Sequence, residues 1–494
     1  MAYNVLNAYD ARARIPQFLG LMQYGNEGTS NPCYAREGVN MMTPGGVLQP
    51  CAKPKTLKPE LTAPIETLAR FYRRWHAQEN EQEVLVAASG GKLYYALNSA
   101  QSWTQLEFPE GVTEWQSNRW SWVTYEINEE GKDPIDILLL SNAKDGMVYV
   151  RGDTLKVEPV KTPYKFNVIT RYSERIWGGA APDEPDMLAY SKPFDPTDWA
   201  ANTEIPEDGG GDIRQPSWDG DSFTHMVQLG SQLICFKKQR IWRVLGTDPG
   251  EYTFKEQYGG GASYPGTVAV DGEKIYMLSS DGLLIYDGLN ASPFMQEYAQ
   301  DVWARLNKAK LDRACACMHR ECYYLSVALD DSEVNNAVVI YNTREQTWLL
   351  RDDLNVERWL SSGDTLYFTS SVAPGRLYEY VEDGWANGGT AVKCRWISPW
   401  NDLNYRDYNK GGFSVYLTAE CRKELNLSIS IQTEKKKKTK VYTVKPPEEG
   451  KFAKQKRMFF GGRGRRFRII IESDGEAMWR LIGGIEIIAE IDGD

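Results

Sequence analysis

One phrase recurs along most of this chain: a turn with Gly, Asp or Asn, an alternating apolar strand that ends in aromatic residues, a second turn and another short strand. It reads SQLICFK at 231–237, DGEKIYML at 271–278 and GDTLYF at 363–368. A four-stranded propeller blade takes about 40 to 50 residues. Most of the intervals between successive copies are of that order, which predicts an all-β β-propeller; the apolar anchors are Leu93, Val148, Ile176, Leu233, Ile275, Tyr323 and Leu366.

The repeats extend over 65–389, which leaves room for six or seven blades. The short interval between Val148 and Ile176 indicates that these anchors share one blade or straddle a boundary. A pair of ordinary β-sandwiches is the alternative, because sandwich strands also recur with regular turn signals. The propeller is favoured because the unit recurs on the scale of a blade. A closed propeller should then largely bury four aromatic side chains, those of Trp103, Trp177, Trp242 and Trp348.

The two flanks of the repeat region differ from it in pattern. Residues 1–64 are rich in Gly and Pro and lack a periodic apolar face, so we predict an extended N-terminal arm. We expect this arm to become ordered mainly through contacts outside its own blade, with another subunit or protein. From 390 to 494 strict alternation returns, for example at 425–431 and 481–488, which predicts a small antiparallel β-sandwich-like domain.

Charge divides the chain sharply. Residues 435–468 hold fourteen Lys and Arg against two acids, a net charge of +12, whereas the whole chain carries −10 and the remainder therefore −22. A lysine run in a hairpin is ordinarily a solvated tip. The segment FFGGRGRRFR at 459–468 adds guanidinium groups that bind phosphate or carboxylate, with glycines that let a backbone approach. We predict a partner-binding or DNA-facing basic patch of Lys435, Lys436, Lys437, Lys438, Arg463, Arg465, Arg466 and Arg468.

Catalytic and metal-binding signals are weak. The chain has only three histidines, and it lacks both the G-x-S-x-G elbow and the phosphate-loop motif. Asp-rich stretches at 206–214 and 218–222 could hold Ca²⁺ or supply two carboxylates for glycoside cleavage, but loops between blades favour the same residues. We predict no enzyme activity, no catalytic residue, no cofactor and no metal.

Eight cysteines are scattered along the chain, and we expect free thiols. Alternation places Cys315, Cys317 and His319 on one strand face, with Cys322 nearby. No second Cys/His pair is close enough in sequence to complete a tetrahedral site, so these residues are interpreted as core rather than as metal ligands. The sequence also shows no signal peptide and no apolar stretch long enough to span a bilayer, which predicts a soluble protein made in the cytosol.

Three phrases carry a resemblance to a known family. They read EGVNMMTPGGV at 37–47, LVAASGGKLYY at 85–95 and SERIWGGAAPDEPDMLAYSKPFDPTDW at 173–199. Together they resemble the propeller-bearing tail-nozzle, or packaged-DNA stabilisation, proteins in the head-to-tail connector region of tailed bacteriophages. The likeness covers roughly 30–380 as an arrangement of phrases. The basic C-terminal domain departs from the family pattern.

The resemblance implies a structural protein of the virion tail, made in the host bacterial cytoplasm, that forms a homo-hexameric ring. Its implied partners are the adaptor, the portal and a tail fibre or tail tip, and no catalytic residues carry over. The expected function is a tail-nozzle or tail-hub subunit below the portal and adaptor that helps close the channel, retain packaged DNA and conduct it during ejection. The alternative is a tail-associated glycan-binding or polysaccharide-degrading propeller protein, which would need exposed aromatics or paired carboxylates at a propeller mouth.

The resemblance also bears on the basic patch. Dense pairing of arginine with phosphate would slow DNA that moves through a channel. A protein partner with an acidic face is therefore favoured over DNA, and nonspecific contact with packaged DNA stays the alternative.

Overall fold

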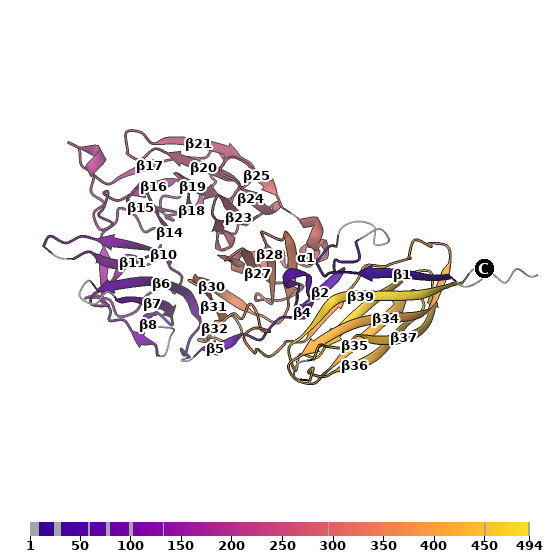
Figure 1. Ribbon diagram of the computed structural model, residues 1–494. Helices are drawn as coiled ribbons and strands as arrows, with labels where there is room; N and C mark the ends of the chain where they lie inside the picture. The colour runs from indigo at the N-terminus through magenta and orange to yellow at the C-terminus, as the bar shows by residue number, and fades with distance from the viewer. Residues whose placement is uncertain are drawn as a thin grey trace, which may run out of the picture.

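The computed structural model is an all-β molecule in which seven antiparallel four-stranded units surround a central axis, beside a β-sandwich (Figure 1). The predicted fold class, a β-propeller with a sandwich-like C-terminal domain, is confirmed, and the number of blades is seven. The first strand of each blade lies nearest the axis, and the following strands lie progressively outward. The structure describes residues 9–23, 31–57, 60–75, 80–97, 102–131, 133–294, 296–448 and 451–492.

The first four blades each consist of four strands that are consecutive in the sequence. Blade 1 comprises β6 (Ile65–Trp75), β7 (Asn80–Ser89), β8 (Lys92–Leu97) and β9 (Thr104–Gln105). Blade 2 comprises β10 (Ser121–Ile127), β11 (Ile135–Asn142), β12 (Gly146–Arg151) and β13 (Val157–Val160). Blade 3 comprises β14 (Val168–Tyr172), β15 (Arg175–Gly179), β16 (Met187–Tyr190) and β17 (Gly211–Arg214). Blade 4 comprises β18 (Phe223–Leu229), β19 (Gln232–Lys237), β20 (Arg240–Leu245) and β21 (Thr253–Tyr258).

The last blade takes its fourth strand from the N-terminal arm. Blade 5 comprises β22 (Ala269–Asp271), β23 (Lys274–Ser279), β24 (Gly282–Tyr286) and β25 (Ala291–Pro293). Blade 6 comprises β26 (Cys315–His319), β27 (Cys322–Val327), β28 (Ala337–Asn342) and β29 (Thr347–Arg351). Blade 7 comprises β30 (Val356–Ser362), β31 (Thr365–Ser370), β32 (Leu377–Glu379) and β5 (Lys55–Leu57).

Hydrophobic side chains fill the space between every pair of neighbouring blades, which closes the ring. Between blades 1 and 7, for instance, Ile65 and Leu85 lie in one buried cluster with Leu360 and Leu377. β5 then completes blade 7, where Leu57 is paired with Leu377. A propeller closed in this way has no free radial gap, because its last sheet contains strands from both ends of the repeat region.

Aromatic burial agrees with a closed ring. Trp177 and Trp348 are completely buried, and Trp103 and Trp242 are half-buried. Local turn chemistry sets the hairpins: Gly90 and Gly91, with φ of 56° and 71°, form the two-residue connection from β7 to β8. Two successive positive φ values are what a type I′ turn requires, and glycine adopts them without strain.

The described residues of the N-terminal arm pair with strands outside the first blade, as expected, and these strands belong to the same chain. β1 (Tyr9–Ile15) pairs along its whole length with the last strand, β39 (Trp479–Asp492). β2 (Glu37–Val39) lies between blade 6 and the sandwich, and β3 (Met41–Met42) pairs with β4 (Gln49–Pro50). Sequence periodicity missed the contacts of β1 and β2 because each is a short strand that adds to an edge supplied by residues hundreds of positions away.

The C-terminal domain is a sandwich of two sheets. One sheet has the order β1-β39-β34-β37 and includes β34 (Asn409–Cys421) and β37 (Lys456–Gly464). The other contains β33 (Cys394–Ile397), β38 (Phe467–Ser473), β35 (Leu425–Thr433) and β36 (Lys437–Val444). Through β2 this second sheet continues into blade 6, which gives one nine-stranded hydrogen-bonded sheet from propeller to sandwich.

Helical structure is confined to short segments. They are α1 (Gln300–Ala304) and the 3₁₀ turns η1 (Pro44–Gly46), η2 (Pro206–Asp208), η3 (Pro265–Thr267), η4 (Gln296–Ala299) and η5 (Lys308–Arg313). In the described part of the chain, no helix has the length and apolar character that a bilayer crossing demands.

Candidate interaction surface

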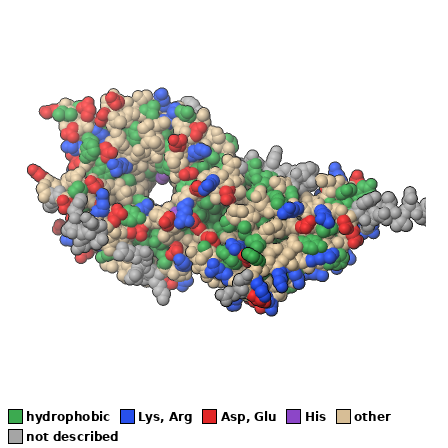
Figure 2. Space-filling model, viewed as in Figure 1, with side chains coloured by type: hydrophobic (Ala, Val, Ile, Leu, Met, Phe, Trp, Pro, Cys, Tyr) green, Lys and Arg blue, Asp and Glu red, His purple; other side chains and the backbone are tan. Residues whose placement is uncertain are grey.

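The predicted basic segment forms the two exposed edge strands of the sandwich and the turns beside them. β36 is the outer strand of the nine-stranded sheet, β37 is the outer strand of the four-stranded sheet, and the two lie against each other. Lys and Arg side chains accordingly gather along the lower side of the sandwich in Figure 2. The exposed surface formed by 435–445 and 451–463 is termed the basic edge.

The structure brings all eight predicted patch residues into this region, at and next to one end of the sandwich. Two adjoining turns hold four of them, the turn between β35 and β36 and the turn between β37 and β38, and the other four lie on the strands beside these turns. Glu434 connects these turns, because its Oε1 accepts a 2.8 Å hydrogen bond from the backbone N–H of Arg466. The lysines are Lys435 and Lys436 before β36 with Lys437 and Lys438 on it; the arginines are Arg463 on β37, Arg465 and Arg466 in the second turn, and Arg468 on β38.

The four lysines are all exposed and point into solvent from an open sheet edge. Lys437 Nζ lies 3.2 Å from Glu472 Oε2, whereas Lys435, Lys436 and Lys438 make no ion pair with any described residue. Lysines on an edge strand also prevent that edge from pairing with another chain, which is a structural role in itself. The lysines are therefore available cations on a surface that is protected from β-sheet extension.

Two of the arginines have internal roles. Arg466 Nε lies 3.5 Å from Glu434 Oε1, and the Arg468 Nε donates to Gln432 Oε1 at 3.1 Å. Both guanidinium groups also face the ring of Trp400, at 5.5 Å for Arg466 and 4.7 Å for Arg468 from the ring centroid. Cation–π contacts of this kind position an arginine and reduce its freedom to reach a partner. From the sequence, the arginines were expected to contribute more to partner binding than the lysines. The contacts indicate the opposite, because Arg466 and Arg468 are held by other residues of the protein.

A buried lysine supports the same end of the sandwich. The Nζ of Lys410 donates hydrogen bonds to the carbonyl oxygens of Tyr408, at 2.9 Å, of Arg465, at 2.6 Å, and of Tyr405. Burial lowers the pKa of Lys410. Three carbonyl oxygens thus surround one ammonium group, which fixes the loop 402–409 and the turn at Arg465 relative to each other.

Sequence reasoning missed the apolar side chains within the basic edge. Val441, Phe452 and Phe459 are exposed there, beside further unpaired cations such as Lys440 and Lys456. The exposure of Val441 could have been predicted from the segment KTKVYTV at 438–444. In a strand, Val441 and Tyr442 lie on opposite faces, and only one of those faces can point into the core. An exposed surface that combines cations with large apolar groups is typical of a protein-binding surface.

The propeller contributes a second region, at the mouth of its central opening (Figure 2). A hollow of about 880 Å³ is lined by residues near the beginnings of the inner strands, among them Thr67, Trp122 and Ile169, and by His225 on β18. Burial lowers the pKa of His225 to about 4. A hollow of this volume is the size of a small-molecule pocket. It is far too small to conduct duplex DNA.

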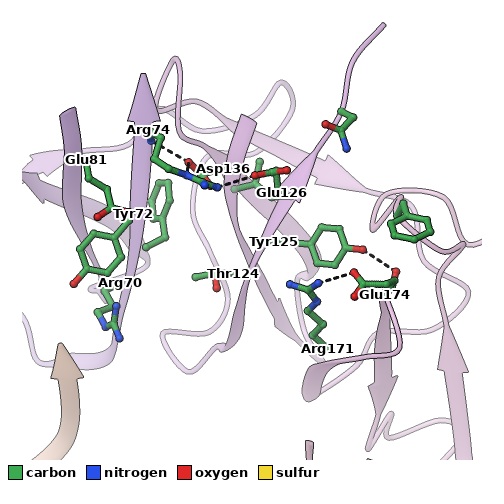
Figure 3. A pocket seen from close by; sticks show the side chains of 14 residues that line it. Arg70, Tyr72, Arg74, Glu81, Thr124, Tyr125, Glu126, Asp136, Arg171 and Glu174 are labelled. Carbon is green, nitrogen blue, oxygen red and sulfur yellow. Dashed lines mark hydrogen bonds and ion pairs between the residues drawn. The ribbon is translucent and has the colours of Figure 1, made fainter. Parts of the chain in front are cut away.

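A second hollow, of about 390 Å³, lies between the inner strands of blades 1 to 3 near their C-terminal ends (Figure 3). Arg74 forms 2.7 Å ion pairs with both Asp136 and Glu126, and Arg171 pairs with Glu174 at 2.5 Å. These ion pairs raise the pKa of Arg74. These three carboxylates are therefore engaged by arginine side chains of the protein.

The cysteine cluster lies in the core between blades 6 and 7. Burial raises the pKa of Cys315 to about 11 and the pKa of Cys317 and Cys322 to about 12. His319 is buried too, with Nδ1 2.8 Å from the hydroxyl of Ser361. Metals bind the thiolate, which a raised pKa disfavours. Across the described ranges, no three His, Cys, Asp or Glu side chains gather as a metal site would need.

One Asp-rich stretch, 218–222, connects blade 3 to blade 4, and the other lies within blade 3, before and on β17. Asp219 forms a 2.6 Å ion pair with Arg240, and the Asp221 carboxylate accepts 3.1 Å hydrogen bonds from the backbone N–H groups of Lys238 and Gln239. Asp208 lies 3.5 Å from the Nζ of Lys192. These carboxylates are already occupied by protein donors, which is the behaviour of turn residues.

Comparisons with known proteins add likenesses to other propellers only. No family model and no curated protein matches the chain. Among solved structures, the chain is similar to BBS1N in complex with ARL6DN, with 12% identity, a TM-score of 0.41, and coverage of 65% of this chain and 94% of the other. It is also similar to the Pan2 WD40 domain of Neurospora crassa, with 9% identity, a TM-score of 0.35, and coverage of 65% and 90%. The propeller assignment rests on the seven blades themselves.

Proposed function

We propose that this chain is a structural subunit of a phage tail nozzle or tail hub. In this role it forms a ring below the portal and adaptor, helps to close the channel, retains packaged DNA and conducts it during ejection. The resemblance of the three sequence phrases suggests the setting. The observation that carries the proposal is the basic edge, an exposed surface rich in Lys and Arg on a domain that is joined to the propeller by one continuous sheet.

The continuous sheet suits an assembly role. In most chains of several domains the connection is a linker, and the domains move relative to each other. Here β2 lies hydrogen-bonded between β29 of blade 6 and β33 of the sandwich, with Val39 paired to both Leu350 and Arg395. A surface on the sandwich is therefore held at a defined position relative to the propeller, as a subunit of a closed ring requires.

The hollows of the propeller are consistent with a structural role for the protein, and they bear on where DNA would pass. The carboxylates Glu126, Asp136 and Glu174 are paired with arginines, and the axial hollow has the volume of a small-molecule pocket. DNA would therefore pass through a space enclosed by several copies of the chain, not through one propeller. This is why the proposal needs a ring.

The test is the mass and shape of the full-length chain, purified at low salt and measured by native mass spectrometry and electron microscopy. We expect rings, with six copies as the family resemblance implies. The chain should also be found in the tails of purified virions. A chain that stays monomeric and cleaves a bacterial surface polysaccharide would overturn the proposal.

One observation favours the alternative of glycan binding. The hollow in Figure 3 presents Tyr72, Tyr125 and several charged groups together, and aromatic rings beside fixed polar groups suit sugar recognition. Binding of host surface oligosaccharides, measured by calorimetry and lost in a Tyr72→Ala variant, would support it. The absence of binding at millimolar oligosaccharide would remove it.

A further inference from the structure

The strongest concentration of acidic residues lies in one loop at the end of the molecule remote from the sandwich. Residues 193–212, termed the acidic loop, connect β16 to β17 in blade 3 and contain six Asp and Glu but no Lys or Arg. Blades 5, 6 and 7 adjoin the sandwich, so blade 3 is on the other side of the ring (Figure 1). The two most highly charged surfaces of the chain thus lie at opposite ends.

A buried cation holds the acidic loop in place. Arg175 is almost completely buried, and its Nη1 donates hydrogen bonds to the carbonyl oxygens of Ser191, at 2.8 Å, and Gly209, at 2.6 Å. Its Nη2 donates to the carbonyl oxygen of Glu207. A side chain at Gly210 would place its Cβ 2.6 Å from the backbone of Trp199, so the loop packs tightly on its own base. The loop is therefore rigid before any partner binds.

The rigid loop presents charge and apolar surface together. Glu204 and Glu207 are exposed and make no ion pair with any described residue. Ile205, which lies between them in the sequence, is 56% exposed, and Phe194, earlier in the same loop, is 64% exposed. Preorganised surfaces lose less conformational entropy on binding, which is the usual reason for fixing an exposed loop from beneath.

The basic edge has the complementary composition. Lys435, Lys438 and Lys440 are exposed and make no ion pair among the described residues. Val441 is 62% exposed on β36, Phe459 is 51% exposed on β37, and Phe452 is 92% exposed in the segment that connects the two strands. Both surfaces therefore offer large apolar groups surrounded by charge, with opposite signs.

We propose that the basic edge of one copy of this chain docks on the acidic loop of the next copy. The contact joins two different surfaces, so repetition of it produces a closed ring when the rotation between neighbours is correct. The inference rests on the proposed ring-forming function and names its subunit interface. Opposite ends of one rigid chain cannot reach each other, so the contact is between copies.

A second copy of the chain explains the apolar groups better than duplex DNA does. The DNA backbone would pair with the lysines but would leave Phe452 and Val441 exposed beside a polar surface. Ile205 and Phe194 of a neighbouring copy would cover them. Charge complementarity also fits the salt-dependent association that an assembly intermediate needs.

The experiment exchanges the charges. One variant carries Glu204→Lys and Glu207→Lys, and the other carries Lys438→Glu and Lys440→Glu. We expect each alone to raise the dissociation constant of the ring at least tenfold in sedimentation velocity at low salt. A chain that carries all four changes should recover most of the assembly. Glu107→Lys with Glu110→Lys on blade 1, two exposed acids outside the acidic loop, is the matched control and should assemble normally.

A disulfide cross-link tests directly whether the two surfaces meet, because it forms only if the acidic loop and the basic edge of two copies lie close together. Chains with Glu207→Cys, mixed with chains with Lys438→Cys, should form a disulfide-linked dimer under mild oxidation. Chains with Glu110→Cys in place of Glu207→Cys should not.

The outcomes separate the interface from the function. If the wild type and both charge variants form rings equally well, the interface is wrong and the ring-forming function stands. If the lysine variant assembles normally but loses binding to a 30-base-pair DNA duplex, the basic edge faces DNA and the interface is wrong. If the wild type stays monomeric at every concentration and salt, the ring and this interface both fail.

Discussion

The Nη1 of Arg175 donates a 2.6 Å hydrogen bond to the carbonyl oxygen of Gly209, which lies 34 positions further along the chain. The donor begins the second strand of blade 3, and the acceptor lies at the end of the acidic loop. The guanidinium also stacks 5.3 Å from the ring centroid of Tyr190. One buried cation thus determines the position of an exposed loop with a charge of the opposite sign.

Replacement of this cation should destabilise blade 3. Arg175→Met removes hydrogen bonds to three carbonyl oxygens and should lower the free energy of unfolding by about 3 kcal/mol, measured by urea denaturation. Hydrogen exchange should become faster at 202–210. Arg214→Met is the control, because Arg214 is exposed and its single ion pair with Glu184 is worth about 1 kcal/mol or less. Equal losses in the two variants would contradict the role given to Arg175.

Closure of the ring by the arm can be tested at Gly375. This residue has a φ of +78°, and a Cβ there would lie 1.7 Å from the carbonyl oxygen of Leu61. Gly375→Ala should therefore displace the arm from blade 7 and cost about 3 kcal/mol or more of unfolding free energy, as strained and overpacked substitutions do. Limited proteolysis should cut near Leu61 in this variant only.

The control for that variant is Gly363→Ala. Gly363 has a φ of +52° with open space around it, so only the backbone penalty of about 1 to 2 kcal/mol applies. If both variants lose the same free energy and resist proteolysis equally, the arm does not contribute to closure.

Acidification should weaken the propeller through His225. Its pKa is about 4 in the folded protein and 6.5 in the unfolded chain, so the unfolded state binds more protons between those values. The free energy of unfolding should fall as pH falls from about 6.5 to about 4, by up to about 3 kcal/mol, and this contribution should then level off. His225→Gln should remove this part of the pH dependence, measured as the difference between the two stability curves. Parallel curves would show that the pKa of His225 is not lowered in the folded protein.

The lysines of β36 should also protect an open sheet edge. Replacement of Lys437, Lys438 and Lys440 by Thr keeps strand propensity but removes the charges, and should cause aggregation with little change in unfolding free energy. Dynamic light scattering against concentration is the measurement. The matched variant with Glu at the same three positions should remain as dispersed as the wild type. A Thr variant that stays dispersed would remove this role from the lysines.

The sequence predicted the parts of the fold that are local. The recurrence of runs such as 231–237 and 363–368 revealed the blades, because each blade is a meander of neighbouring strands. β5 and β2 escaped prediction, since three residues such as 55–57 carry no period. Their structure is determined by partners near Leu377 and Leu350, which sequence pattern cannot connect to them.

The candidate surface was predicted in composition but not in detail. The run of lysines at 435–438 was visible as charge, and its position on an edge strand followed only from the sheet order. The partners of Arg466 and Arg468, including Trp400, depend on how two turns meet in space. The acidic loop was read as a set of turns, because the buried contact that makes it rigid comes from Arg175, outside the loop.

The pairing of β1 with β39 has a consequence for how the chain is made. Tyr9 is paired with Ile491, and β5 meets a strand that begins at Leu377. A ribosome exposes the N-terminal strands first, and they stay without these partners until the partners have been synthesised. The sandwich therefore cannot be completed before 479–492 have left the ribosome, and until then β1 and the edge that it will cover remain unpaired.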